Sequence, residues 1–594
     1  MTPRPRLLLL LVAGALLLGA CTTIPDSSSP DVVRTVDNGP VAATPRSCAP
    51  SGSLARTVVT SFLQLNAGAN FDAARVCLTA NAQASWAPGS NVTIVDNQTI
   101  GNLRQGKVRV SGRQVGQLIN GAYKPTLTGD GTGDSGTPLT VSFRMAKVHG
   151  QWRINSVQPN GRLVTTDQFE DFQQRFLYFY DVAETKLVPV PLYTQITDPQ
   201  DLTRWLVTNL AGGPDSNALA TALPGQPEPT QIRVFFPPDS EGLSVRVDIP
   251  GVSQLSGAAP GRLAVQLAKT LEQAGVTRIA ISDQGAPLHI GRGTSFTPQS
   301  VLHHGDNPYE PKASPGYLFY LDNGALRQTV GASSRPVPGP VGQGVYALTS
   351  AAVTLPAGSQ DFRIAGVRGI GADKYLLVGD QQGPLRPTRP RLSGDLSRPA
   401  WAPGGGEIWI GDGHKLDRVL TRSRDVQNVP IEPPLAQKTY ITAVRLSPEG
   451  ARIAMVVSQS PASNPDIGTP SEIWVGTIVR AGGRVRVAGL TQISPPDVHV
   501  NDVAWYDADK LFAIGSYTAT GNFATFEVQA DGSLWTFHLP VNLPGRPTSL
   551  TAASNSVAVV AVASSLWRQD GASWVALLGG EGGFAPGTNP IYIE

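Results

Sequence analysis

Three places in the sequence carry side chains that could do covalent, nucleophilic or metal chemistry. They are Cys21, the segment Gly133–Gly136 with Ser135, and the segment 303–310 with His303, His304, Asp306 and Glu310. A cysteine thiolate can be acylated or oxidised, and a serine becomes a nucleophile when a base takes its proton. Histidines beside carboxylates can hold a metal ion. Whether any of these groups can act depends on the chain around it.

Cys21 ends a segment with the features of an export signal. Arg4 and Arg6 supply positive charge, and LLLLLVAGALLLG then runs apolar for about 13 residues. A helix that spans a bilayer needs about 20 apolar residues, so the stretch is too short to be a stable span. The small residues before Cys21 are typical of a cleavage site.

The sequence Leu18-Gly19-Ala20-Cys21 resembles the lipobox of bacterial lipoproteins. That resemblance implies cleavage between Ala20 and Cys21 and lipidation of the Cys21 sulfur. The predicted location is the extracytoplasmic face of the cell membrane, with the lipid as anchor. The alternative is a secreted protein whose cysteine lies near the cleavage site by chance.

Cys48 and Cys77 are the other two of only three cysteines. If Cys21 takes the lipid, an even pair is left in an oxidising compartment, where two thiols close in sequence can join. The pair would close a loop of about 30 residues and contribute roughly 3 kcal/mol. Two independent buried thiols remain the alternative.

Neither of the other two segments supports catalysis or a metal site. Gly133-Asp134-Ser135-Gly136 resembles the nucleophile motif of trypsin-like proteases, but no histidine precedes Ser135, and a flexible hairpin loop explains the glycines equally well. His303 and His304 are adjacent in a Pro- and Gly-rich linker, where neighbouring side chains diverge. We therefore predict no catalytic residue, no metal and no cofactor.

Composition bounds the remaining possibilities. The 63 Gly and 50 Pro with 15% charged residues indicate a turn-rich, largely β protein. Without Arg4 and Arg6 the chain has 45 basic and 45 acidic residues and no basic run, which excludes a nucleic-acid footprint. Residues 21–50 are rich in Ser, Pro and Asp and predict a disordered tether with a reach of about 30 Å.

Residues 51–165 predict two helices on a curved antiparallel sheet. Leu54, Val58, Phe62 and Leu65 share one helical face, and residues 71–78 continue as a second helix. The last two strands meet at His149-Gly150, and this hairpin is similar to those of NTF2-like domains. The sequence therefore predicts an NTF2-like α+β domain.

Residues 166–290 predict a second α+β domain. A hairpin surrounds residues 181–185, Asp198-Pro199 begins a helix, and another helix ends at Gly275. The segments Leu210–Pro214, Thr221–Gly225 and Val245–Asp248 look like those of a GerMN domain, a family without established catalytic residues. The aromatic residues Phe172, Phe176, Tyr178 and Phe179 are expected in packing rather than in a ligand platform.

From Pro315 onward the pattern is one of short strands separated by turns. Four stretches repeat an apolar strand, a turn and a second apolar strand, at intervals of about 45 to 60 residues, and they begin at Arg398, Thr442, Asp502 and Thr548. This is the spacing of propeller blades. Residues 317–327 supply half a blade, which Pro590–Glu594 could complete. We predict a β-propeller of about six blades.

The predicted chain is multidomain, with two α+β domains (NTF2-like, then GerMN-like) followed by an all-β propeller. Its expected parts are a signal peptide (1–20), a tether (21–50), the NTF2-like domain (51–165), the GerMN-like domain (166–290), a linker (291–314) and the propeller (315–594). This order resembles the LpqB lipoproteins of actinobacteria.

That resemblance implies a non-enzymatic accessory lipoprotein. Its partner would be the extracytoplasmic domain of an MtrB-like sensor histidine kinase, in cell-envelope and division signalling. A cell-wall glycan binder and a hydrolase at the propeller channel are the alternatives.

Overall fold

The computed structural model describes residues 48–594 with internal gaps. The gaps are 90, 128–135, 159–160, 215, 225–227, 239–241, 292, 303–316, 331–332, 357, 370–373, 463–468, 518–520, 539–540, 555 and 578–585. Ala20, Cys21, Ser135 and the His303–Glu310 segment therefore lie outside the described residues. No helix within the described part of the chain is long and apolar enough to cross a membrane.

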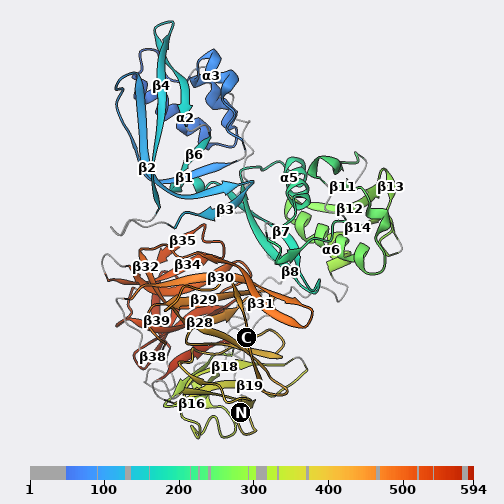
Figure 1. Cartoon of the computed structure of the whole chain (residues 1–594), viewed down its shortest axis with the longest axis vertical. Coiled ribbons are helices and arrows are strands. Elements are labelled where there is room, and N and C mark those ends of the chain that lie inside the picture. The colour runs from blue at the N-terminus through green and yellow to red at the C-terminus, as the bar shows by residue number, and fades with distance from the viewer. Residues whose placement is uncertain are drawn as a thin grey trace, which may run out of the picture. The chain divides into compact units, whose positions relative to one another are not determined.

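The first α+β domain packs three short helices on one face of a sheet (Figure 1). The helices are α2 (Ala55–Ala67), the 3₁₀ helix η1 (Phe71–Cys77) and α3 (Ala80–Ser85). The sheet runs β5–β4–β2–β1–β6, with β3 on β2. Its strands are β1 (Val92–Ile100), β2 (Lys107–Ile119), β3 (Ala122–Pro125), β4 (Thr137–Val148), β5 (Gln151–Gln158) and β6 (Arg162–Thr165).

Aromatic rings fill the space between α2 and this sheet. The Phe62 ring meets the Trp86 and Phe143 rings edge to face, with centroids 5.4 and 5.7 Å apart. The turn predicted between β4 and β5 lies at His149-Gly150, where both residues have positive φ. The expected helices and curved sheet are therefore confirmed in outline.

Three details of the first domain differ from the sequence prediction. Leu54 is 72% exposed rather than on the inner face, because it is the extended N-cap residue that precedes α2. The second helix is the tighter η1, not an α-helix, and it is followed by α3, which the pattern did not indicate. The sheet is mixed, because β6 pairs with β1 in parallel.

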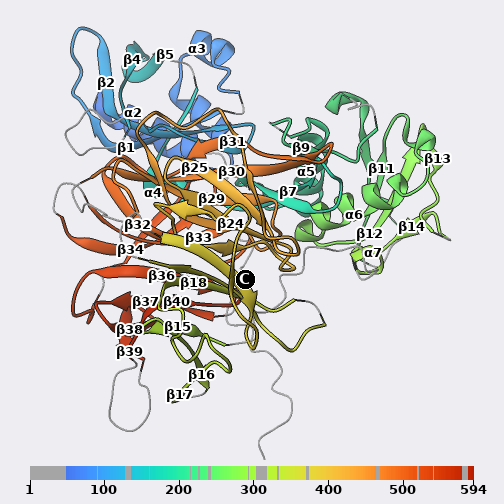
Figure 2. The same ribbon diagram turned by 60° about the horizontal axis from the view of Figure 1, so that its bottom comes forward.

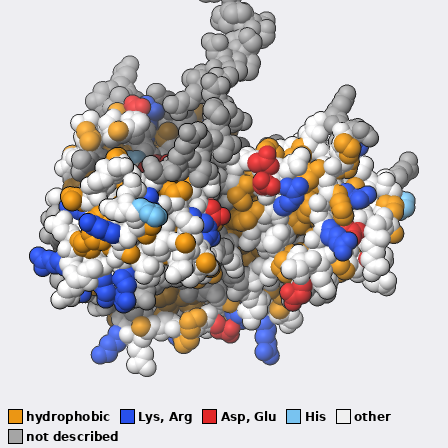
Figure 3. Space-filling model, turned by 90° about the horizontal axis from the view of Figure 1, so that it is seen from above, with side chains coloured by type: hydrophobic (Ala, Val, Ile, Leu, Met, Phe, Trp, Pro, Cys, Tyr) orange, Lys and Arg blue, Asp and Glu red, His pale blue; other side chains and the backbone are white. Residues whose placement is uncertain are grey.

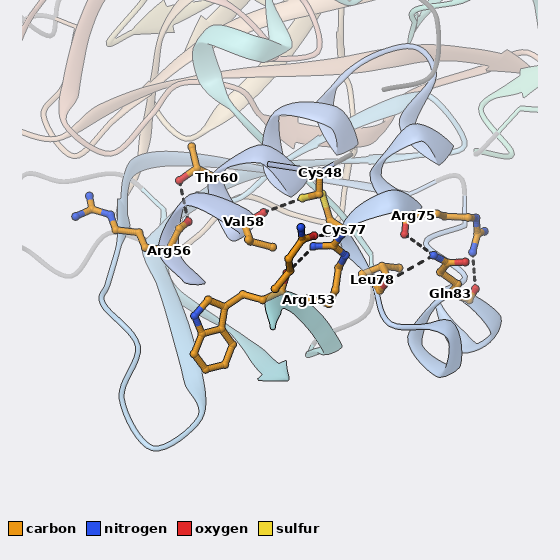
Figure 4. Close-up of a disulfide and its surroundings, with 11 residues drawn as sticks. Cys48, Arg56, Val58, Thr60, Arg75, Cys77, Leu78, Gln83 and Arg153 are labelled. Atoms are coloured by element: carbon orange, nitrogen blue, oxygen red, sulfur yellow. Dashed lines mark hydrogen bonds between the residues drawn. A yellow bond between two sulfur atoms is a disulfide. The ribbon is translucent and has the colours of Figure 1, made fainter. Parts of the chain in front are cut away.

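A disulfide joins Cys48 to Cys77, with the two Cα atoms 4.8 Å apart (Figure 4). Both cysteines are buried, and the bond connects the chain just before α2 to the last residue of η1. The bridge therefore holds the start of the first domain against its helical layer.

We expect this disulfide in the mature protein. Intact-mass analysis of a lipid-free form (residues 22–594) should show the mass of two added hydrogens on reduction. The Cys48→Ser/Cys77→Ser variant should lose about 3 kcal/mol of unfolding free energy, because its unfolded chain is no longer cross-linked. Full alkylation of both thiols without reductant would contradict the pairing.

The second α+β domain builds on a hairpin, a sheet and three helices. The hairpin is β7 (Gln173–Asp181) with β8 (Leu187–Thr194), and β9 (Leu219–Ala220) pairs with β7. The sheet contains β10 (Arg233–Phe235), β11 (Leu243–Asp248), β12 (Val276–Asp283), β13 (Ala286–Pro287) and β14 (Ser295–Phe296). The helices are α5 (Pro199–Ala211), α6 (Ala259–Leu271) and α7 (Pro298–Leu302), preceded in the chain by α4 (Thr166–Phe169).

Predicted helix signals are realised in this domain. Asp198 caps α5 by accepting hydrogen bonds from the backbone of Gln200 and Asp201. Gly275, with φ 76°, ends the helical segment that contains α6. Phe172 and Phe179 are buried, while Phe176 and Tyr178 are half-buried, so these rings contribute to packing.

Helix α6 and the 3₁₀ helix η4 (Glu272–Ala274) that follows it cover one edge of β7 with polar side chains. The Gln273 amide donates to the Phe176 carbonyl and accepts from its N–H, and Thr270 accepts from the N–H of Tyr178. These residues, with the buried Gln266, are spaced so that they share one helical face. The backbone N–H and C=O groups along this edge of β7 are therefore hydrogen-bonded to helical side chains rather than to another strand.

The last part of the described chain forms six sheets of four or five strands. Blade 1 is β15 (Phe319–Asp322), β16 (Ala325–Val330), β17 (Ser333–Pro336) and β40 (Thr588–Ile591). Blade 2 is β18 (Leu348–Thr354), β19 (Arg363–Arg368), β20 (Lys374–Asp380), β21 (Arg386–Pro387) and β22 (Ser393–Gly394). Blade 3 is β23 (Ala400–Trp401), β24 (Glu407–Asp412), β25 (Lys415–Leu420) and β26 (Asp425–Asn428).

The remaining blades continue the same order. Blade 4 is β27 (Ile431–Glu432), β28 (Tyr440–Leu446), β29 (Arg452–Ser458), β30 (Ser471–Ala481) and β31 (Arg484–Gln492). Blade 5 is β32 (Val498–Trp505), β33 (Lys510–Tyr517), β34 (Phe523–Gln529) and β35 (Trp535–His538). Blade 6 is β36 (Pro547–Ala553), β37 (Ser556–Val562), β38 (Ser565–Asp570) and β39 (Ser573–Ala576).

The ring closes where β40 pairs with β15, as the half-blade pattern predicted (Figure 2). Each pair of neighbouring blades shares one hydrophobic cluster, including the pair formed by blades 6 and 1. Strand β29, for example, is buried along its whole length because a blade covers each face. Six interfaces of this kind account for most of the apolar residues beyond Pro315.

Candidate functional site

The centre of the propeller is the first place to look for chemistry, because enzymes on this fold use the central channel. Arg398, just before β23, lies there and is 9% exposed. Its Nε, Nη1 and Nη2 atoms donate to the carbonyls of Ala351, Leu550 and Pro590, at 3.3, 3.1 and 2.8 Å. These acceptors belong to β18, β36 and β40, so one guanidinium connects blade 3 to three other blades.

A second buried arginine completes the network. Arg445 in β28 pairs with Asp502 in β32, with Nη2 and Oδ1 2.9 Å apart. The other oxygen of Asp502 accepts a hydrogen bond from the N–H of Leu550 at 3.0 Å. The same carboxylate therefore links blades 4, 5 and 6.

Glu594 adds a carboxylate to this centre. Its Oε2 accepts a hydrogen bond from the N–H of Trp401 at 2.6 Å. Burial raises the pKa of the Glu594 carboxyl, and Arg445 and Arg398 oppose that shift. Burial in turn lowers the pKa of Arg398 to about 10, so its guanidinium stays charged at neutral pH.

The described centre is suited to holding blades together rather than to bond-making. Its guanidiniums cannot accept a proton near neutral pH, and their donors are used on main-chain carbonyls and on Asp502. No group of three His, Cys, Asp or Glu side chains with metal-ligand geometry occurs among the described residues. The network of Arg398, Arg445, Asp502 and Glu594 therefore holds the blades together at the centre of the propeller, and we call it the central tie.

Sequence reasoning missed this network. Arg398, Arg445 and Asp502 each lie in or beside the innermost strand of a blade, and two of them begin the repeated stretches noted above. A charged residue in such a strand is a usable signal, since a buried charge requires a partner. The partner itself could not be found, because it comes from another blade.

A second titrating group lies in the turn between β32 and β33. Burial, together with the neighbouring Asp507 carboxylate, raises the pKa of Asp509 to about 7, while Arg452 and Lys510 oppose the shift. In the unfolded chain an aspartate loses its proton near pH 4. The folded state therefore binds more protons than the unfolded state between about pH 4 and 7.

The stability of the propeller should consequently fall as pH rises through this window. Asp509→Asn should flatten the fall and raise the unfolding free energy at pH 8 by about 1–3 kcal/mol. Denaturant unfolding at pH 5 and 8, followed by tryptophan fluorescence, measures both. The exposed Asp570→Asn is the matched control and should leave the slope unchanged. An identical pH slope in the wild type and in Asp509→Asn would refute the assignment.

Comparison with known proteins agrees with this architecture. Residues 49–170 match the family model described as "Lipoprotein LpqB, N-terminal domain", and residues 324–589 match "Lipoprotein LpqB beta-propeller domain". The LpqB lipoprotein of Mycolicibacterium smegmatis is 28% identical over 486 residues, covering 76% of this chain and 78% of that protein. The LpqB of Nocardia farcinica is 27% identical over 580 residues, covering 91% and 90%.

Among solved structures, TolB from Acinetobacter baumannii is 14% identical and covers 55% of this chain and 85% of its own, with a TM-score of 0.32. The number of six blades comes from the six sheets of this structure and not from the likeness to TolB. The protein is thus a multidomain chain with an α/β region followed by a β-propeller. It belongs to the LpqB lipoprotein family.

Proposed function

We propose that this protein is a lipid-anchored, extracytoplasmic accessory protein without enzymatic activity. In this account it binds the outer domain of an MtrB-like sensor histidine kinase and modulates signalling in envelope and division control. The observation that carries the proposal is the match to both LpqB domain models, one at each end of the described chain. The Cys21 lipid would place the protein at the membrane, where such a kinase senses.

The centre of the propeller supports a binding role over a catalytic one. Arg398 and the Arg445–Asp502 pair are engaged in tying blades together. A ring fixed in this way keeps its outer surfaces in place, and a preorganised surface loses less entropy on binding. This favours a scaffold for protein contacts.

The surface in Figure 3 also fits a protein partner. On this face acidic, basic and hydrophobic side chains are interspersed, without one large field of a single sign. A polyanion such as nucleic acid would instead favour a continuous basic patch. The near-balance of 45 acidic and 47 basic residues in the whole sequence agrees with this interpretation.

A direct test is titration of the lipid-free form (residues 22–594) with the kinase's outer domain, with a panel of cell-wall glycans in parallel. In the cell, a tether with a reach of about 30 Å would raise the local concentration of the protein near the kinase, so a modest intrinsic affinity would be enough. We therefore expect saturable but weak binding to the kinase domain in solution. No turnover of ester, peptide or glycoside substrates is expected. Saturable binding to a glycan without binding to the kinase would favour the wall-binding alternative.

A further inference from the structure

An open cavity of about 540 Å³ lies between blade 3 and the segment that connects this blade to β28. One wall is formed by His414, Lys415 and Leu416, where β24 turns into β25, and by Asn428 at the end of β26. The other wall is the segment 429–439. The volume falls within the range of small-molecule sites.

Backbone hydrogen bonds hold both ends of that segment. Near its start, the N–H of Val429 donates to Leu416 and the N–H of Val487 donates to Pro430, both at 2.8 Å. Just beyond its end, the N–H of Ile441 donates to Gly413 at 2.8 Å. The cavity is therefore present before any ligand binds, which lowers the entropic cost of binding.

The lining combines an apolar floor with a cationic rim. Leu416 and Val429 are 1% and 3% exposed and belong to the hydrophobic cluster between blades 3 and 4, against which Leu435 also packs. Lys415 and Lys438 are exposed at the rim. Among the described residues neither lysine forms a salt bridge, and no Asp or Glu lines the cavity.

Three acidic residues lie near the rim without lining the cavity. Asp412 and Asp417 interact electrostatically with Lys415, and neither carboxylate lines the cavity. Glu432 forms a salt bridge with Arg486, in which Glu432 Oε2 and Arg486 Nη1 are 2.9 Å apart. His414 is held by Thr439, whose carbonyl contacts its Nδ1, and by the Tyr440 ring at a centroid distance of 4.5 Å.

We propose that this cavity binds a small molecule with one anionic group and an apolar body. The apolar body would lie on Ile431 and Leu435, which line the cavity and are only partly buried. The anionic group would lie between Lys415 and Lys438. This pairing uses both features of the site, since an apolar pocket supplies burial while a few polar groups fix the orientation. The proposal does not depend on the kinase partner.

The test is binding of octanoate to the lipid-free protein (residues 22–594) by isothermal titration calorimetry, with octylamine as the probe of reversed charge. We expect saturable octanoate binding and at least about tenfold weaker binding of octylamine. Lys415→Gln/Lys438→Gln should weaken octanoate by about fivefold or more and should reduce the preference over octylamine. The Lys107→Gln/Lys147→Gln variant, in the first domain, is the matched control and should bind like the wild type.

A second variant tests the floor separately from the rim. Ala436→Trp would place a large ring at the cavity wall and should abolish octanoate binding while leaving the unfolding midpoint of the propeller unchanged. Three results would overturn the proposal: no saturable octanoate binding, equal binding of octylamine, or unchanged affinity in the Lys415→Gln/Lys438→Gln variant.

Discussion

Cys21→Ala is expected to release the protein completely from the membrane fraction. The proposed lipid at Cys21 would bury many CH₂ groups, each contributing about 0.8 kcal/mol, and two acyl chains are enough for stable anchoring. Within the described residues no helix offers an alternative span. Fractionation of cells that express the variant, with blotting of the membrane and released fractions, measures the effect.

The control for this experiment is Cys48→Ala, which removes a cysteine but leaves the proposed lipid site intact. That variant should stay in the membrane fraction. A Cys21→Ala protein that is cleaved after its signal and yet remains fully membrane-bound would contradict the lipid anchor.

Arg398→Ala is expected to cost about 3–5 kcal/mol of unfolding free energy. The substitution leaves the carbonyls of Ala351, Leu550 and Pro590 without their donor, and it removes a positive charge that faces Asp502 and Glu594. Buried groups that lose their partners are costly, because water cannot replace the lost bonds. Seven of the ten tryptophans lie in the propeller, so fluorescence during denaturant unfolding reports mainly on this part.

Two further variants make the result specific. Arg422→Ala removes an exposed arginine of the same propeller and should change stability by less than about 0.5 kcal/mol. Arg398→Lys keeps the charge but cannot make three bonds in the fork geometry, so an intermediate loss is expected. A loss below about 1 kcal/mol in Arg398→Ala would show that the central tie is unimportant.

Local patterns predicted the architecture well. The Asp198-Pro199 start of α5, the Gly275 end of the α6 segment and the His149-Gly150 turn are local signals, and each lies where it was expected. The propeller followed from the spacing of repeated strand pairs. Closure by β40 followed from an incomplete first blade, since a blade with exposed edges needs a partner strand.

Interactions between distant residues could not be predicted in the same way. Arg398 and Pro590 are 192 residues apart, and nothing in the sequence near either residue identifies the other. The cavity beside blade 3 depends in the same way on how segment 429–439 passes over β25 and β26. The prediction that Leu54 lies on the inner face of the first helix was wrong for a local reason, because helical periodicity does not show where a helix begins.

We propose that the protein binds a sensor kinase at the membrane. The most direct measurement is crosslinking in intact cells, with a photoreactive residue placed at exposed positions of the propeller and with mass spectrometry of the trapped species. We expect the outer domain of an MtrB-like kinase to be recovered, and we expect Cys21→Ala to abolish its recovery. Recovery of cell-wall polymer alone, with no kinase at any position, would contradict this proposal.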